Sequence, residues 1–216
     1  MSNDPFERIQ FLNRVQSGAP LNFHLKTMFS NFKIAGLDFL SLYDECMSLT
    51  GTSAPSWKTF RRAQRALILG QYFDYSLSVE GRKAECGVLR GFSALFTNQI
   101  AQTRDKSWTG ENYHLIDSFE GLSKPDLKDA IFSGNQPPVV SHQAGHFAVP
   151  LIEVKKNLTS FPNLNFHKGW IPDIFASLPE DKWSYVHIDV DLYRPTLQSL
   201  EYFFPRMATG GVIIND

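Results

Sequence analysis

The sequence is poor in the features that mark several large classes of protein. Only two cysteines occur in 216 residues, Cys46 and Cys86, which argues against a disulfide framework and predicts two reduced, buried thiols. No apolar run reaches the roughly 18 residues of a membrane span, and the first residues show no signal-peptide pattern. The formal net charge of -1 provides no basic excess for nucleic acid. These absences predict a cytoplasmic protein that binds neither membranes nor nucleic acid.

The chain has ample apolar material, with 43% hydrophobic residues and 18 Phe, and its pattern changes near residue 80. Residues 1–80 have apolar side chains at helical spacing, which predicts a helical N-terminal extension or lid with helices near 39–47 and 57–77. Residues 81–216 alternate apolar strands with helical segments, which is typical of a doubly wound, mostly parallel α/β sheet. The expected strands are 82–87, 113–117, 164–168, 183–189 and 211–215, and the expected helices are 91–104, 150–160 and 195–204.

A glycine turn follows the first expected strand and contains Glu85, Gly87 and Gly91. Glycines let the backbone turn tightly and approach a ligand, and the helix that follows offers free N–H groups. Asp117 ends the second strand, where a carboxylate can hold ribose hydroxyls. A pyrophosphate cofactor would favour G-x-G-x-x-G, whereas an acid suits the amino group and sulfonium of S-adenosylmethionine. Glycines present for packing alone are the alternative.

A second cluster of polar residues follows the strand near 183–189. In an extended chain His187, Asp189 and Asp191 point to the same side. Asp216 ends the next strand, so Asp189 and Asp216 should lie side by side and suit Mg²⁺ or another divalent cation. Two alternatives are a solvated turn in which Asp191 caps a helix and the acid-x-acid motif of a metal-dependent glycosyltransferase. His187, within a strand, is more typical of a hydrogen-bonded core residue.

Five blocks of sequence, in this order and spacing, resemble the macrocin O-methyltransferase family. The blocks are 85–91, 117–122, 168–173, 189–193 and 210–216. The resemblance implies a Rossmann-like class I methyltransferase fold and an enzyme that uses S-adenosylmethionine and magnesium. It also implies an acceptor that is a sugar or another vicinal diol. Members of the family usually continue with another acid and two more strands, so we expect a C-terminally truncated member, and a non-catalytic remnant is a further alternative.

The resemblance also implies roles for individual residues. The implied cofactor contacts are Glu85, Gly87 and Gly91 at the methionine end with Ser93 as a further contact, Asp117 at the ribose with Ser118 and Phe119 beside it, and Gly169 and Trp170 near the adenine. Asp189 and Asp216 are the implied metal ligands. Asp191 or His142 would take the proton from the acceptor hydroxyl.

Three further expectations concern the surface. Residues 123–149 have no apolar period and several Gly and Pro, which predicts a lid that carries His142 and His146. The run that contains Arg61, Arg62 and Arg65 predicts a solvated helix face. The apolar strand 211–215 would leave an open edge, so we expect a homo-oligomer, most simply a dimer.

Overall fold

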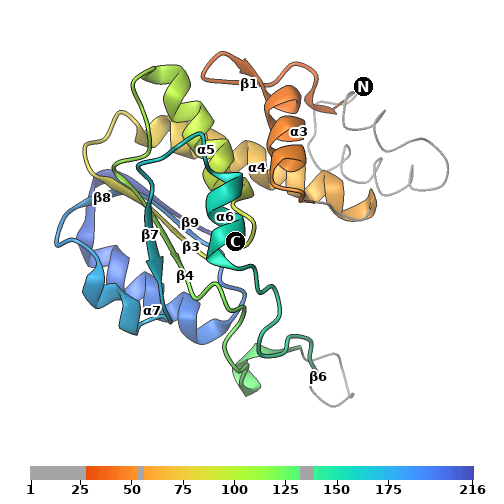
Figure 1. The fold of residues 1–216 in the computed structure, drawn as a ribbon, viewed down its shortest axis with the longest axis vertical. Helices are drawn as coiled ribbons and strands as arrows, with labels where there is room; N and C mark the ends of the chain where they lie inside the picture. The colour runs from red at the N-terminus through yellow and green to blue at the C-terminus, as the bar shows by residue number, and fades with distance from the viewer. Residues whose placement is uncertain (1–27, 53–55, 132–138) are drawn as a thin grey trace.

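The computed structural model describes residues 28–52, 56–131 and 139–216, and a five-stranded parallel sheet forms its centre (Figure 1). The strand order is β7-β4-β3-β8-β9, so the order reverses between β3 and β8. The strands are β3 (Arg82–Cys86), β4 (Tyr113–Asp117), β7 (Asn165–Lys168), β8 (Trp183–Ile188) and β9 (Met207–Asn215). Ligands bind at such a reversal, beyond the carboxyl ends of the strands.

Helices cover both faces of this sheet, which confirms the predicted doubly wound α/β fold. Strand side chains alternate between the faces. Tyr113, Leu115 and Tyr185 join the core beneath the helices on one face, while Cys86 and Ile188 join a second core. The helices are α3 (Phe39–Leu49), α4 (Ser56–Ser76), α5 (Phe92–Arg104), α6 (Leu151–Asn157) and α7 (Tyr193–Phe203), with 3-10 turns η2 (Leu127–Asp129), η3 (Asp173–Ser177) and η4 (Phe204–Arg206).

The predicted boundaries differ from the observed ones by a few residues. The helix expected over 150–160 ends at Asn157, and the helix expected over 195–204 already begins at Tyr193, ahead of Pro195. The strand expected over 211–215 begins earlier, at Met207, but its regular pairing with β8 resumes only at Val212. The glycines at 210 and 211 lie in the interruption.

The described part of the N-terminal extension packs into the same core as the sheet. Phe39 of α3 contacts the ring of Phe96 in α5 edge-on, with 6.2 Å between centroids, and Phe73 of α4 contacts Tyr185 of β8 at 5.0 Å. A two-residue hairpin, β1 (Lys33–Ile34) with β2 (Leu37–Asp38), precedes α3. The helical layer therefore forms one wall of the domain.

The segment over 123–149 contains little regular structure, as predicted, although residues 132–138 lie outside the described ones. It includes η2 and the short pair β5 (Ala130–Ile131) and β6 (Val139–Val140). Asp126 accepts a hydrogen bond from Arg194 at 2.6 Å, and Asp129 accepts one from the backbone N–H of Tyr193 at 2.7 Å. The start of the segment is therefore fixed to α7, and closure of a lid stays a prediction.

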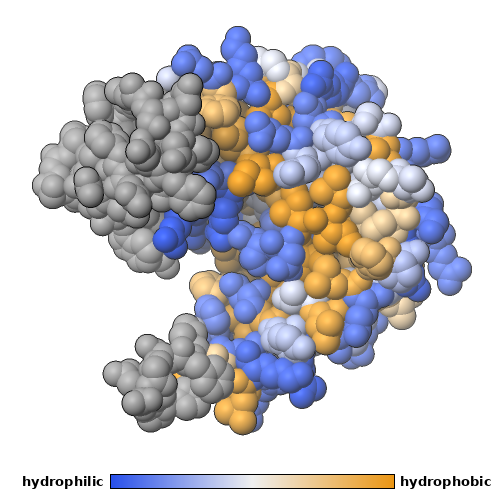
Figure 2. All heavy atoms as spheres, turned by 180° about the vertical axis from the view of Figure 1, so that it is seen from behind, coloured by the Kyte–Doolittle hydropathy of each residue, from blue (hydrophilic) through white to orange (hydrophobic). Residues whose placement is uncertain are grey.

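The outermost strand of the described sheet on one side is β9, which pairs only with β8. Beside it, α4 exposes Ile68, Tyr72 and Tyr75, spaced one helical turn apart. Hydrophobic side chains also gather in the middle of the surface opposite to the view of Figure 1 (Figure 2). Among the described helices, none has the length and apolar character required to cross a membrane.

Candidate active site

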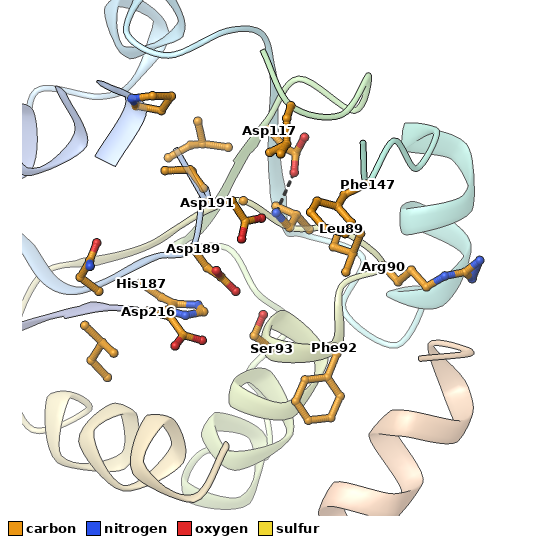
Figure 3. Close-up of a pocket in the computed structure, with 18 of the residues that line it drawn as sticks. Leu89, Arg90, Phe92, Ser93, Asp117, Phe147, His187, Asp189, Asp191 and Asp216 are labelled. Atoms are coloured by element: carbon orange, nitrogen blue, oxygen red, sulfur yellow. Dashed lines mark hydrogen bonds between the residues drawn. The ribbon is translucent and has the colours of Figure 1, made fainter. Parts of the chain in front are cut away.

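A pocket of about 480 Å³ opens at the carboxyl ends of β3, β4, β8 and β9 (Figure 3). The first turn of α5 and the loops after the strands form its floor, and α3 and α4 form one wall. Phe147 and Trp170 lie at its rim and are 51% and 42% exposed. The volume is within the range of small-molecule and cofactor sites.

The glycine turn runs along the bottom of this pocket. Gly87 and Gly91 have φ values of +87° and +85°, which side-chain-bearing residues rarely adopt. A Cβ at Gly87 would overlap the carbonyl oxygen of Asp189, so the turn after β3 can approach the turn after β8 only with glycine there. Gly91 is the N-cap of α5 and packs against Leu158. Glycine therefore brings the two turns together.

Asp117 holds the turns after β3 and β4. Its Oδ2 accepts a hydrogen bond from the backbone N–H of Val88 at 2.7 Å, and its Oδ1 accepts one from the N–H of Phe119 at 2.7 Å (Figure 3). Each carboxylate oxygen has more than one lone pair, so both can accept a further hydrogen bond from a ligand. Phe119 lies in the turn after β4, where its side chain is buried and its backbone has a φ of +55°.

Glu85 lies beneath the pocket and is fully buried. Its carboxylate accepts hydrogen bonds from Ser93 Oγ at 2.6 Å and from Tyr113 Oη at 3.2 Å. Its Oε2 also lies 3.9 Å from Nδ1 of His187, the residue opposite it on β8. The sequence predicts a direct cofactor contact for Glu85, but in the structure Glu85 contacts the pocket only through the side chains that line it.

His187, Asp189 and Asp216 bring their ligand atoms within 4.8 Å of one another, and the close-up shows all three at one end of the pocket (Figure 3). The pKa of Asp189 is raised to about 6, chiefly by burial; His187 and Arg65 oppose this shift, and the carboxylates of Asp216 and Asp191 contribute to it. Like charges brought this close are costly without a cation. The side-by-side placement of Asp189 and Asp216 matches the expectation from the sequence.

His187 of this cluster and Arg65, which lies beside Asp216, differ from their predicted roles. His187 is 5% exposed but is not a hydrogen-bonded core residue, because its Nδ1 has no hydrogen-bond partner among the described residues. Arg65 does not lie on a merely solvated helix face, because Nη1 is 2.8 Å from both carboxylate oxygens of Asp216. Both side chains line the pocket.

The structure brings most of the predicted site residues together. The predicted residues that line the pocket are Gly87, Ser93, Asp117, Ser118, Gly169, Trp170, Asp189, Asp191 and Asp216. Glu85, Gly91, Phe119 and His142 are not among the lining residues. His142 nevertheless lies near enough to Asp191 to influence its pKa. Burial has the larger effect and raises the pKa of Asp191, whereas the charge of His142 lowers it, and the net result is a raised pKa.

The sequence predicts an extension or lid from the N-terminal helices but identifies none of the individual residues with which they form a wall of the pocket. The lining residues from this region are Tyr43, Met47, Thr52, Arg62, Arg65, Ala66, Ile68 and Leu69. The run of arginines near residue 62 is the one signal in the sequence that could have indicated it.

The family model described as macrocin-O-methyltransferase (TylF) matches residues 75–216, which include every strand of the sheet and most of the pocket. The chain belongs to this family of O-methyltransferases. This membership confirms the resemblance and does not support the glycosyltransferase alternative, because the matched family transfers methyl groups.

Curated relatives carry similar names. The chain is 27% identical over 143 residues to demethyldecarbamoylnovobiocin O-methyltransferase of Streptomyces niveus, covering 64% of this chain and 53% of the relative. It is 26% identical over 142 residues to mycinamicin III 3''-O-methyltransferase of Micromonospora griseorubida, covering 64% of this chain and 55% of the relative. The chain thus spans about half the length of the curated relatives it matches.

Solved methyltransferases share the fold. The O-methyltransferase NovP superposes with a TM-score of 0.58 and 24% identity, covering 71% of this chain and 64% of NovP. A calicheamicin methyltransferase superposes with a TM-score of 0.58 and 18% identity, covering 93% of this chain and 82% of the other. At these identities the likeness supports the class I methyltransferase fold alone.

Proposed function

We propose that this protein transfers the methyl group of S-adenosylmethionine to a hydroxyl of a sugar or another vicinal diol, with a divalent cation at the acceptor. The pocket carries the proposal, because it joins a glycine turn and a strand-end carboxylate to a His-Asp-Asp cluster within one cavity. The names of the two curated relatives, O-methyltransferases of demethyldecarbamoylnovobiocin and of the 3'' position of mycinamicin III, support the acceptor class.

The cofactor half of the pocket fits an adenosyl group. Asp117 has acceptor capacity left for the two ribose hydroxyls after binding Val88 and Phe119. Trp170 and Gly169 extend along the wall beyond β7, where an adenine ring would find an aromatic surface. The backbone of the Gly87–Gly91 turn and Ser93 face the methionine end. S-adenosylmethionine supplies the methyl group.

The acceptor half fits a divalent cation. Asp189 and Asp216 offer carboxylate oxygens, which are the ligands that Mg²⁺ and Mn²⁺ prefer. Such a cation supplies Lewis-acid polarisation of the acceptor hydroxyl. A carboxylate oxygen of Asp191 accepts the hydroxyl proton, and the raised pKa of Asp191, caused chiefly by burial, suits that role. His142, which belongs to the 123–149 segment, then stabilises the Asp191 carboxylate.

Calorimetry with S-adenosylhomocysteine tests the cofactor half. We expect binding to the wild type and at least ten-fold weaker binding to Asp117→Asn, which removes the charge and replaces one acceptor oxygen with a donor. Asp105→Asn is the matched control, because it makes the same substitution at an exposed carboxylate that caps the end of α5 and lies outside the pocket lining. Absence of binding to the wild type would refute the proposal.

Methyl transfer to a panel of free and linked sugars tests the reaction itself. Turnover that depends on added Mg²⁺ or Mn²⁺ and is lost in Asp191→Asn is the expected result. Cofactor binding without turnover on any sugar or diol would favour the non-catalytic remnant instead.

A further inference from the structure

His187 has the features of an unused ligand. The residue is only 5% exposed, and its Nδ1 atom is buried without a hydrogen-bond partner among the described residues. A buried polar atom without a partner costs free energy, so it calls for an explanation. One nitrogen of this ring lies within 4.8 Å of the carboxylates of Asp189 and Asp216.

Glu85 is placed to orient that ring. The pairing of β3 with β8 sets Glu85 directly opposite His187, and Glu85 Oε2 lies 3.9 Å from His187 Nδ1. At 3.9 Å this is an ion-pair distance but not yet a hydrogen bond. Hydrogen bonds from Ser93 and Tyr113 fix the Glu85 carboxylate, so the imidazole is the part that can rotate to close the gap.

We propose, building on the function proposed above, that His187 gives the cation a nitrogen ligand beside Asp189 and Asp216, and that Glu85 positions it by accepting its Nδ1–H. A histidine that binds a metal commonly donates its second N–H to a carboxylate, which fixes the tautomer and the ring orientation. Nδ1 faces Glu85, so Nε2 is the nitrogen left for the cation.

The distances allow this arrangement with side-chain movements of about 2 Å or less. Two ligands at about 2.1 Å from one ion lie ~4.2 Å apart on opposite sides of it and about 3.0 Å apart when they are adjacent in octahedral geometry, so donors within 4.8 Å need to approach by about 2 Å or less. Closing the Glu85–His187 gap to hydrogen-bond length requires a shift of about 1 Å. Rotation of the imidazole and of the two carboxylate side chains about their side-chain bonds can supply these movements.

A histidine ligand would change which cation the site prefers. Carboxylate oxygens suit both Mg²⁺ and Mn²⁺, whereas an added imidazole nitrogen disfavours Mg²⁺, which takes oxygen ligands, more than it disfavours Mn²⁺, a first-row transition metal. The wild type should therefore prefer Mn²⁺ to Mg²⁺, and removal of the imidazole should narrow that preference.

Electron paramagnetic resonance with Mn²⁺ tests the ligand directly. In the full chain we expect Mn²⁺ to show spin-echo modulation from a directly bound nitrogen, and incorporation of nitrogen-15-labelled histidine should change that modulation. His187→Gln should abolish it and lower the affinity for Mn²⁺ more than that for Mg²⁺. His146→Gln, a histidine that does not line the pocket, is the matched control and should leave the signal intact.

The positioning role has its own measurement. Glu85→Gln should keep the nitrogen modulation but weaken Mn²⁺ binding by about 10- to 100-fold. Unchanged affinity in Glu85→Gln would overturn the role of Glu85. Bound Mn²⁺ without histidine modulation in the wild type, or no Mn²⁺ binding at all, would overturn the role of His187. Calorimetry with S-adenosylhomocysteine on the same samples separates this failure from failure of the proposed function.

Discussion

Gly87→Ala is the substitution whose cost the structure predicts most sharply. Two effects add at this position: a φ of +87°, and overlap of the new Cβ with the carbonyl oxygen of Asp189. Gly36→Ala isolates the first effect, because Gly36 has nearly the same φ, +84°, and a Cβ there would meet nothing within 4 Å. The difference between the two variants therefore measures the overlap alone.

The loss of stability expected in each variant follows from the backbone conformation and the contacts of the glycine. The left-handed backbone costs an L-residue about 1–2 kcal/mol, and in a domain of this size 1 kcal/mol lowers the melting temperature by about 2–4 °C. Gly36→Ala should therefore melt roughly 2–8 °C below the wild type. Relief of the overlap at Gly87 disturbs two flanking hydrogen bonds, from Asp189 N to Cys86 O at 2.8 Å and from Gly87 N to Ile116 O at 3.0 Å. Each of these hydrogen bonds contributes about 1 kcal/mol to stability, so Gly87→Ala should lower the free energy of unfolding by about 2 kcal/mol more than Gly36→Ala does.

Thermal unfolding and calorimetry of the two variants provide the assay. Gly87→Ala should also bind Mn²⁺ and S-adenosylhomocysteine weakly, because relief of the overlap moves Asp189 and the glycine turn. Gly36→Ala should bind both as the wild type does, since the hairpin lies outside the pocket lining. Equal melting temperatures for the two variants, or normal ligand binding by Gly87→Ala, would refute the reasoning.

Three further predictions concern charge and assembly. Arg65→Ala removes a cation that competes for Asp216 and should tighten Mn²⁺ binding about two- to five-fold, whereas Arg61→Ala, outside the pocket lining, should not. Burial and then His167 lower the pKa of His114 to about 4. Below pH 6.5 His114 binds a proton in the unfolded chain but stays neutral in the folded chain. The free energy of unfolding therefore falls by up to about 1.4 kcal/mol per pH unit as the pH is lowered from 6.5 to 4. A flatter profile in His114→Asn checks this, and an unaltered profile counts against it. The unpaired side of β9 predicts a dimer in sedimentation experiments, which a monomer at all concentrations would exclude.

The sheet could be predicted because its strands are short and separated by helical segments. Burial on both faces favours apolar runs in parallel strands, and residues 212–214 of β9 form such a run, whereas β3 and β7 contain few apolar residues and are recognised by their position between helical segments. Elements that depend on few residues were missed, such as η3 and the hairpin of β1 and β2. Their apolar residues are too few to show a period, and their placement depends on contacts with distant parts of the chain.

The pairing of Asp189 with Asp216 could also be predicted, because carboxyl ends of neighbouring parallel strands meet at one edge. The ion pair of Arg65 with Asp216 could not, because it depends on how α4 lies against β9. A helical period identifies which side of a helix faces solvent. It does not identify a contact between two residues that are 151 positions apart in the sequence, as Arg65 and Asp216 are.

Glu85 shows where a motif and a structure lead to different chemistry. The pattern of acid and glycines predicts a carboxylate that contacts the cofactor, but the acid points into the core face, fully buried, while the glycines form the turn. A buried carboxylate is costly unless its oxygens are satisfied, and here Ser93 and Tyr113 satisfy them. Ser93 lines the pocket beside the glycine turn, and His187 lies in the His-Asp-Asp cluster. One buried side chain therefore supports residues at both ends of the pocket, which gives a physical reason for an acid at this position that does not require contact with any ligand.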